Sequence, residues 1–358
     1  MEQRTRAVIA ALAIAAIFLL IQLGALALVE PFKAAGKQAT ENPQSATNSI
    51  VYVAALLLMT GFMLLAFKYD LDALIRGIIV LTGGYIGFEV FATIVPSTLL
   101  PVAGVSAFAW LFAAAIIVGL VVHPEWYVID AAGIVMGAGA AGLFGISFGV
   151  LPALVLLVAL AVYDAISVYG TEHMLTLAKG VMDLRVPVVL VIPLSLSYSF
   201  LDAGTPQSIA EEDGEENADG DSSEAGETTA ETDGNAYEVD AEGAEIDEDS
   251  IEAEEVDPLD REALFIGLGD AVIPTVLVAS AAFFAPGSVP SLGLPGIAVP
   301  LTAATAMIGT FVGLAVLIRM VLKGNAHAGL PLLNGGTIAG YLVGALLSGL
   351  SLVQILGL

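Results

Sequence analysis

Four acidic side chains stand inside long apolar stretches of this sequence, where a charged group is expensive to bury. They are Glu89, Asp130, Asp164 and Asp270. A carboxyl group at such a depth can pass on a proton, bind a cation or act as a general acid or base, so each is a candidate for function. The chain has no cysteine and only three widely separated histidines, which argues against thiol chemistry and a histidine metal centre.

Two of the four carboxyls have simple structural interpretations. Asp130 lies about one turn inside its apolar stretch, beside Trp126 and Tyr127, so we expect it to reach the membrane interface. Glu89 lies deeper, and an interhelical hydrogen bond explains it more simply than a role facing substrate.

The other two carboxyls can be paired by their depth in the membrane. Asp164 lies six residues before Gly170, where one apolar stretch ends, and Asp270 lies seven residues after Ala263, where the next begins. At 1.5 Å per helical residue these separations are about 9 and 10 Å. Two antiparallel helices would therefore hold both carboxyls at one level. Depth alone leaves open a pair of unrelated polar contacts.

The local sequence around the pair limits the chemistry further. Tyr163 precedes Asp164, and Gly267, Leu268 and Gly269 precede Asp270. Two glycines before a membrane carboxyl leave one helix face bare and favour irregular backbone beside a polar cavity. A proton- or cation-coupled transporter or channel would also use such carboxyls and glycine-broken helices. No inverted repeat between the two halves is visible, which lowers that alternative.

Tyr-Asp on one helix, followed by Gly-Leu-Gly-Asp on the next, resembles the presenilin and signal-peptide-peptidase family of GxGD intramembrane aspartyl proteases. The resemblance covers nearly the whole chain except residues 202–260. The family's third motif, Pro-Ala-Leu-Pro, is matched in part by Ala328-Gly329-Leu330-Pro331. Pro331 suits a helix start and should leave the preceding residues extended, so that Gly329 and Leu330 shape one wall of the active site.

The resemblance implies an aspartic endopeptidase that cleaves transmembrane segments of other membrane proteins. Asp164 and Asp270 would be its catalytic pair and would activate a water molecule, with no metal and no organic cofactor. The short N-terminal tail and the acidic linker resemble the archaeal, single-subunit type, for which no obligatory accessory subunit is expected. Its partners would be transmembrane substrates and the lipid bilayer.

Composition excludes several other classes of protein. The 358 residues are 57% hydrophobic and only 13% charged, against about 25% charged residues in an ordinary soluble domain. The mean hydropathy is +0.89. A soluble enzyme, a nucleic-acid binder and a disulfide-stabilised secreted domain are therefore excluded.

The pattern of apolar stretches predicts an all-α polytopic membrane protein, a presenilin-like bundle of nine transmembrane helices. The predicted spans are 7–29, 49–67, 75–95, 100–122, 126–143, 148–169, 263–285, 299–318 and 332–353. Small residues recur at every fourth position in two of them, which predicts close helix packing. These residues are Gly133, Gly137, Ala141 and Gly145, and Gly336, Gly340, Gly344 and Ser348.

The distribution of basic residues predicts a cytoplasmic N-terminus in the cell membrane and an extracellular C-terminus. This orientation leaves only Lys33 and Lys37 outside. It places nine basic residues inside: Arg4, Arg6, Lys68, Arg76, Lys179, Arg185, Arg261, Arg319 and Lys323.

The chain divides into four parts on this interpretation. Residues 1–170 carry helices one to six, and 262–358 carry helices seven to nine. Residues 171–201 form a cytoplasmic connection, with an interfacial helix over 171–185 and extended backbone over 186–201. Residues 202–261 form an acidic linker that cannot bury enough apolar surface to fold.

Overall fold

The computed structural model describes residues 3–69, 71–170, 189–194, 198–199, 263–294, 297–321 and 328–357. The predicted interfacial helix at 171–185 and the predicted acidic linker at 202–261 lie outside these residues. Of the predicted extended stretch 186–201, the structure describes 189–194 and 198–199.

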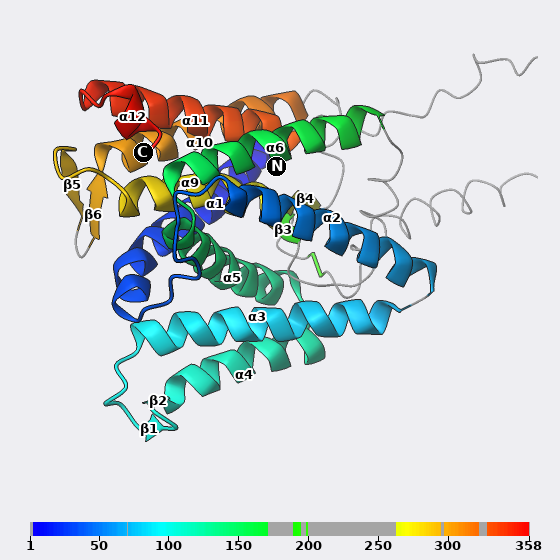
Figure 1. Cartoon of the computed structure of the whole chain (residues 1–358). Coiled ribbons are helices and arrows are strands. Elements are labelled where there is room, and N and C mark those ends of the chain that lie inside the picture. The colour runs from blue at the N-terminus through cyan, green and yellow to red at the C-terminus, as the bar shows by residue number, and fades with distance from the viewer. Residues whose placement is uncertain are drawn as a thin grey trace, which may run out of the picture.

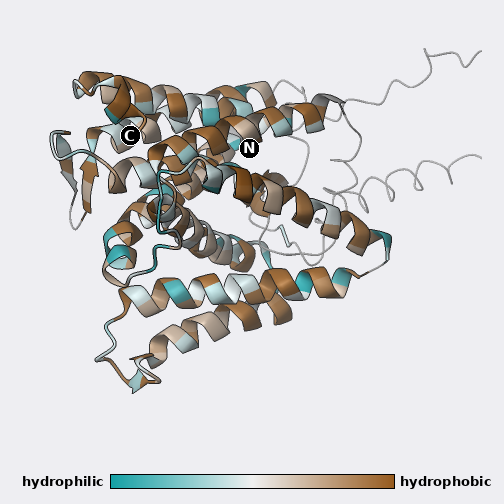
Figure 2. Cartoon of the chain, in the orientation of Figure 1, coloured by the Kyte–Doolittle hydropathy of each residue, from teal (hydrophilic) through white to brown (hydrophobic). Residues whose placement is uncertain are grey.

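Helices make up most of the described chain (Figure 1). They are α1 (Gln3–Ala34), α2 (Thr47–Lys68), α3 (Asp72–Ile94), α4 (Ala107–Val122), α5 (Trp126–Ser147), α6 (Val150–Gly170), α9 (Leu268–Phe283), α10 (Leu301–Val321), α11 (Gly329–Leu347) and α12 (Leu352–Ile355). Seven of the described helices are long and apolar enough to cross a membrane. Figure 2 shows apolar residues predominating along them.

The predicted all-α membrane fold is confirmed, and each predicted span overlaps one of these helices over most of its length. The count of nine crossings stays a prediction, because α4 and α9 have only 16 residues each. At 1.5 Å per residue such a helix is about 24 Å long, short of about 30 Å of hydrocarbon.

Helices α1, α5 and α9 pack on one another at the centre of the bundle. The pair α10–α11 packs against α9, and α6 contacts both α9 and α11. On the other side of the bundle, α3 packs between α4 and α5 (Figure 1). Helix α9 is deeply enclosed, with every residue from 274 to 281 buried. Beyond its first turns, the helix that carries Asp270 is therefore surrounded by neighbouring parts of the chain.

The predicted small-residue packing is present at two helix interfaces. A Cβ added to Gly145 of α5 would clash with Ala279 of α9. A Cβ added to Gly336 of α11 would clash with the carbonyl oxygen of Gly309 of α10. Such contacts exclude any side chain, so the backbones of α10 and α11 approach as closely as glycine allows.

This packing predicts that alanine destabilises the protein at one of two adjacent glycines of α11 and not at the other. Gly336→Ala should lower the free energy of unfolding by about 1–3 kcal/mol, because its methyl group has no room. Gly335→Ala is the matched control, since no atom of the described residues lies within 4 Å of a Cβ added there. Thermal unfolding of the two variants in detergent measures the difference. Equal melting temperatures would show that α10 and α11 separate without cost.

Within the described residues, three two-stranded antiparallel sheets lie between helices: β1–β2 (Pro101–Val102, Val105–Ser106), β3–β4 (Val189–Pro193, Ala263–Gly267) and β5–β6 (Ser291–Leu294, Ile297–Pro300). The β3–β4 sheet brings together segments on either side of the acidic linker. It packs beside α5, and β4 leads directly into α9.

Two predicted helix starts are wrong, because short strands come first. The predicted span 100–122 begins with the β1–β2 hairpin, and its helix starts at Ala107. The predicted span 263–285 begins with β4, and its helix starts at Leu268. The short apolar stretch 263–267 fits a buried strand as well as a helix, and its pairing with β3 makes it a strand.

Candidate active site

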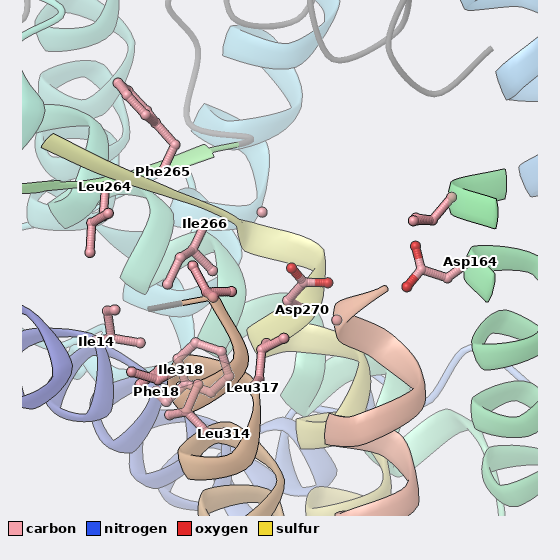
Figure 3. A pocket seen from close by; sticks show the side chains of 14 residues that line it. Ile14, Phe18, Asp164, Leu264, Phe265, Ile266, Asp270, Leu314, Leu317 and Ile318 are labelled. Atoms are coloured by element: carbon pink, nitrogen blue, oxygen red, sulfur yellow. The ribbon is translucent and has the colours of Figure 1, made fainter. Parts of the chain in front are cut away.

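Asp164 and Asp270 line one cavity of about 240 Å³. Its other walls are apolar side chains from α1, β4 and α10, together with Gly267 and Gly329. Figure 3 shows the two carboxyl groups pointing toward each other, Asp164 from α6 and Asp270 from the start of α9. Two acidic groups thus meet in a small space that is otherwise largely hydrophobic.

Asp270 is held at the junction between β4 and α9. Gly267 is the N-cap residue of α9 in an extended conformation (φ −60°, ψ 130°), so Asp270 lies in the first turn. The predicted depth of seven helical residues for Asp270 is therefore wrong, because residues 263–267 are a strand. A carboxyl in the first turn also faces the positive end of the helix dipole.

Asp164 is held by the N-terminus of α11. The main-chain N–H of Leu330 donates a hydrogen bond of 3.1 Å to Oδ2 of Asp164. Leu330 is the second residue of α11, so its N–H has no partner inside its own helix. The N-cap residue of α11, Ala328, makes no side-chain capping hydrogen bond. Asp164 of the neighbouring helix α6 supplies an acceptor to this helix end.

Gly329 brings the same helix end against the other carboxyl. A Cβ added to Gly329 would lie 3.5 Å from Oδ2 of Asp270, and one added to Gly267 would lie 3.4 Å from the same atom. The first residues of α11 thus bind Asp164 through a hydrogen bond, and Gly329 leaves room for about one methyl group beside Asp270. Further along, Nδ2 of Asn334 donates to the carbonyl oxygen of Leu157 at 2.9 Å, which fixes α11 on α6.

The predicted site residues divide into two groups. Asp164, Asp270, Gly267 and Gly329 line the cavity. Tyr163 does not line it and is 38% exposed.

Both residues between Gly267 and Asp270 also lie off the cavity. The nearest described neighbour of a Cβ added to Gly269 is Ile273, at 3.9 Å. Leu268 packs toward Gly137 of α5.

The third motif differs from its expected shape. The motif predicts extended residues before Pro331, but α11 already begins at Gly329; of the described residues just before the helix, Ala328 is extended. A proline is compatible with the first turn of a helix because its missing N–H would have no partner there. The side chain of Leu330 packs against the apolar cluster formed by Phe148, Leu156 and Leu160 and is not part of the cavity wall.

Apolar residues of α1 and α10 form a wall of the cavity that the sequence does not predict. They are Ile14 and Phe18 of α1, and Leu314, Leu317, Ile318 and Val321 of α10 (Figure 3). Their spacing of three or four residues is helical, but both helices are apolar on every side. The sequence therefore carries no contrast that marks the inward face.

The remaining two membrane carboxyls lie elsewhere. Oε2 of Glu89 forms an ion pair of 2.6 Å with Nζ of Lys37, so its partner comes from the α1–α2 connection and the expected interhelical hydrogen bond is wrong. The predicted place of Asp130 at the membrane interface stays a prediction; within the bundle it is only 8% exposed. Its Oδ1 accepts a hydrogen bond of 2.8 Å from the main-chain N–H of Val191 in β3.

The space around Gly329 predicts that alanine is accepted there. A Cβ would meet Oδ2 of Asp270 and Cδ2 of Leu317 at 3.5 Å each, which is ordinary contact. We expect Gly329→Ala to keep the cleavage rate within about threefold of wild type, since nothing near the carboxyls has to move. The substitution should also raise the free energy of unfolding by roughly 0.4–1 kcal/mol. Cleavage kinetics and thermal unfolding test both values; a hundredfold slower variant would contradict this geometry.

Similarity to known proteins agrees with this arrangement. Residues 15–350 match the family model described as signal-peptide peptidase, presenilin aspartyl protease. A crystal structure of a presenilin family intramembrane aspartate protease in space group C222 is 30% identical, with a TM-score of 0.57, and the match covers 94% of this chain and 99% of that chain. A second structure with that description, in space group P2, is 31% identical, with a TM-score of 0.55 and coverage of 94% and 97%.

No curated protein matches this sequence. The transporter or channel alternative finds no support in these similarities. With a family model that spans most of the chain and solved structures that match almost end to end, the chain belongs to the signal-peptide-peptidase and presenilin family of intramembrane aspartyl proteases.

Proposed function

We propose that Asp164 and Asp270 are the catalytic pair with which this intramembrane aspartyl protease hydrolyses peptide bonds. The observation that carries the proposal is their placement: of the four membrane carboxyls, these two face each other across one cavity, while Asp130 and Glu89 have partners elsewhere. Gly267 and Gly329 lie beside Asp270, so a backbone segment can approach that carboxyl.

Hydrolysis needs one carboxyl of the pair with a proton and one without. Two negative charges across a small apolar space repel each other, so the pair shares one proton. The ionised carboxylate takes a proton from water as that water attacks the scissile carbonyl carbon. The protonated carboxyl donates to the carbonyl oxygen and stabilises the tetrahedral intermediate. The Leu330 N–H holds one oxygen of Asp164 in place, which limits the positions that this carboxyl can take.

The substrate is a transmembrane segment of another protein, and its helix must open before its carbonyl groups can be attacked. The cavity offers the opened segment apolar walls from α1, α10 and β4. The stretch 186–201 is a poor place for substrate pairing, because Val189–Pro193 already pairs with β4. We therefore propose that the opened substrate lies along the cavity beside β4.

Orientation and subunit composition complete the proposal. The N-terminus and residues 170–262 lie in the cytoplasm and the C-terminus outside, supported by the excess of basic residues on the proposed inner side. The chain acts without an accessory subunit. Because the natural chain has no cysteine, single cysteines placed in each connection can be labelled from either side of the membrane to test the orientation.

Cleavage by the purified chain tests the function directly. The protein alone, in detergent, should cut a reporter transmembrane helix, and a transition-state-analogue inhibitor of aspartyl proteases should block the reaction. Cleavage that resists the inhibitor would contradict an aspartyl mechanism. Activity that appears only after a second membrane protein is added would contradict the single-chain proposal.

A further inference from the structure

Asp130 is a buried carboxyl outside the cavity for which the proposed reaction has no use. It lies on α5, is 8% exposed, and accepts a 2.8 Å hydrogen bond from the N–H of Val191. A buried carboxyl is costly in a membrane bundle unless its partner needs it. An apolar side chain would fill the space more cheaply, so the contact with β3 is the feature to explain.

The contact occupies the edge of β3 that faces away from β4. Main-chain groups alternate between the two edges of a strand, so an N–H of Val191 that donates to Asp130 points away from the partner strand. Pro193 lies two residues further along, on the same edge, where its missing N–H breaks no bond to β4. Asp130 is therefore the side chain that ties the outer edge of β3 to α5.

The tie reaches the catalytic pair through the sheet. Val191 lies opposite Phe265 in the β3–β4 register, and Val189 lies opposite Gly267. Gly267 is the N-cap residue of α9, three residues before Asp270. A shift of β3 across α5 would move β4 with it, and the first turn of α9 would follow.

The N-cap residue of α5, Glu125, is a second acidic side chain that contacts the same segment. Oε1 of Glu125 accepts a 2.6 Å hydrogen bond from the hydroxyl of Ser199, beyond the end of β3. The side chain of Val191 packs in one apolar cluster with Ile129 of α5. The cytoplasmic half of α5 thus forms a platform on which β3 rests, and Asp130 contacts the strand itself.

We infer that Asp130 is a positioning residue for catalysis, which sets the place of Asp270 by fixing β3, and through it β4, on α5. The inference rests on the proposed Asp164 and Asp270 pair. It assigns no contact between Asp130 and the substrate. Misplacement of a reacting group by about 1 Å can cost a hundredfold in rate, so a loose sheet should slow the chemical step.

The test compares Asp130→Asn with Asp130→Leu in the purified protein. Asparagine keeps an acceptor oxygen for Val191, so kcat should stay within about threefold of wild type; leucine removes the acceptor, and kcat should fall roughly tenfold to a hundredfold. KM for the reporter helix should change by less than about twofold in both, since the cavity walls are not altered.

Glu89→Leu is the matched control, because it also removes an 8% exposed carboxyl, on α3 and away from the sheet. It should lower the melting temperature while leaving the kcat of the folded protein unchanged. Equal losses of kcat in Glu89→Leu and Asp130→Leu would overturn the inference, as would a wild-type kcat in Asp130→Leu or equal losses in both Asp130 variants.

Val191→Pro removes the donor in place of the acceptor and decides the case if Asp130→Leu does not fold. It should reproduce the loss of kcat, and a wild-type kcat would contradict the inference. Variants of the catalytic pair, measured alongside, keep the two proposals apart. If Asp164→Asn or Asp270→Asn cleaves the reporter, the proposed pair is wrong, whatever the Asp130 variants show.

Discussion

Asp164→Asn and Asp270→Asn should each abolish proteolysis while leaving the protein folded in the membrane. An amide cannot take a proton from water or share one with the remaining carboxyl, so each change removes the working unit as a whole. We expect a loss of at least about 10⁴-fold in kcat, with the double variant no slower than either single variant. Asparagine at 164 keeps an acceptor oxygen for the Leu330 N–H, so the start of α11 should stay in place.

The measurement is cleavage of a reporter transmembrane helix by purified variants of equal melting temperature. Wild-type protein treated with a transition-state analogue gives the background rate. Robust cleavage by either single variant would show that one carboxyl suffices, and the assignment of the pair would fail. A double variant that is much slower than both singles would show that the two residues act independently.

The meeting of the two carboxyls could be predicted because it depends mainly on depth. Membrane helices run across the same layer, so positions counted from one side of the bilayer bring distant residues to one level. The prediction for Asp164 used a true helix, α6. The prediction for Asp270 treated residues 263–267 as helix, although they form β4. Because β4 leads directly into the N-terminal end of α9, Asp270 stays at that end in either case, and its pairing with Asp164 is unchanged.

Contacts that depend on distant pairing could not be predicted. The register between β3 and β4 joins residues some seventy positions apart, and no local pattern specifies it. The contact of Asp130 with β3 could not be predicted for the same reason, because that strand comes from far along the sequence. The apolar walls from α1 and α10 were missed because uniformly apolar helices show no inward face. The two glycines before Asp270, in contrast, correctly indicated irregular backbone, since Gly267 is extended.

The same two glycines give the last prediction, in which one substituent has different effects at two neighbouring positions. Valine at 267 suits the extended backbone there, so the strand itself should tolerate it. Its Cβ would lie 3.4 Å from Oδ2 and 3.8 Å from Cγ of Asp270, and its methyl groups would reach further. Either the carboxyl rotates away or the start of α9 shifts, so we expect about a hundredfold loss in cleavage rate.

Gly269→Val is the control for that loss. A Cβ at 269 would meet only Cδ1 of Ile273, at 3.9 Å, among the described residues, and the position is exposed. We expect a rate within about threefold of wild type, because nothing beside the carboxyl has to move. Cleavage kinetics, inhibitor affinity and melting temperature of the two variants decide between steric effects and loss of backbone flexibility. If flexibility at depth is what the glycines supply, Gly269→Val should be as slow as Gly267→Val. If Gly267 supplies space beside Asp270, only the first variant should lose activity and inhibitor binding.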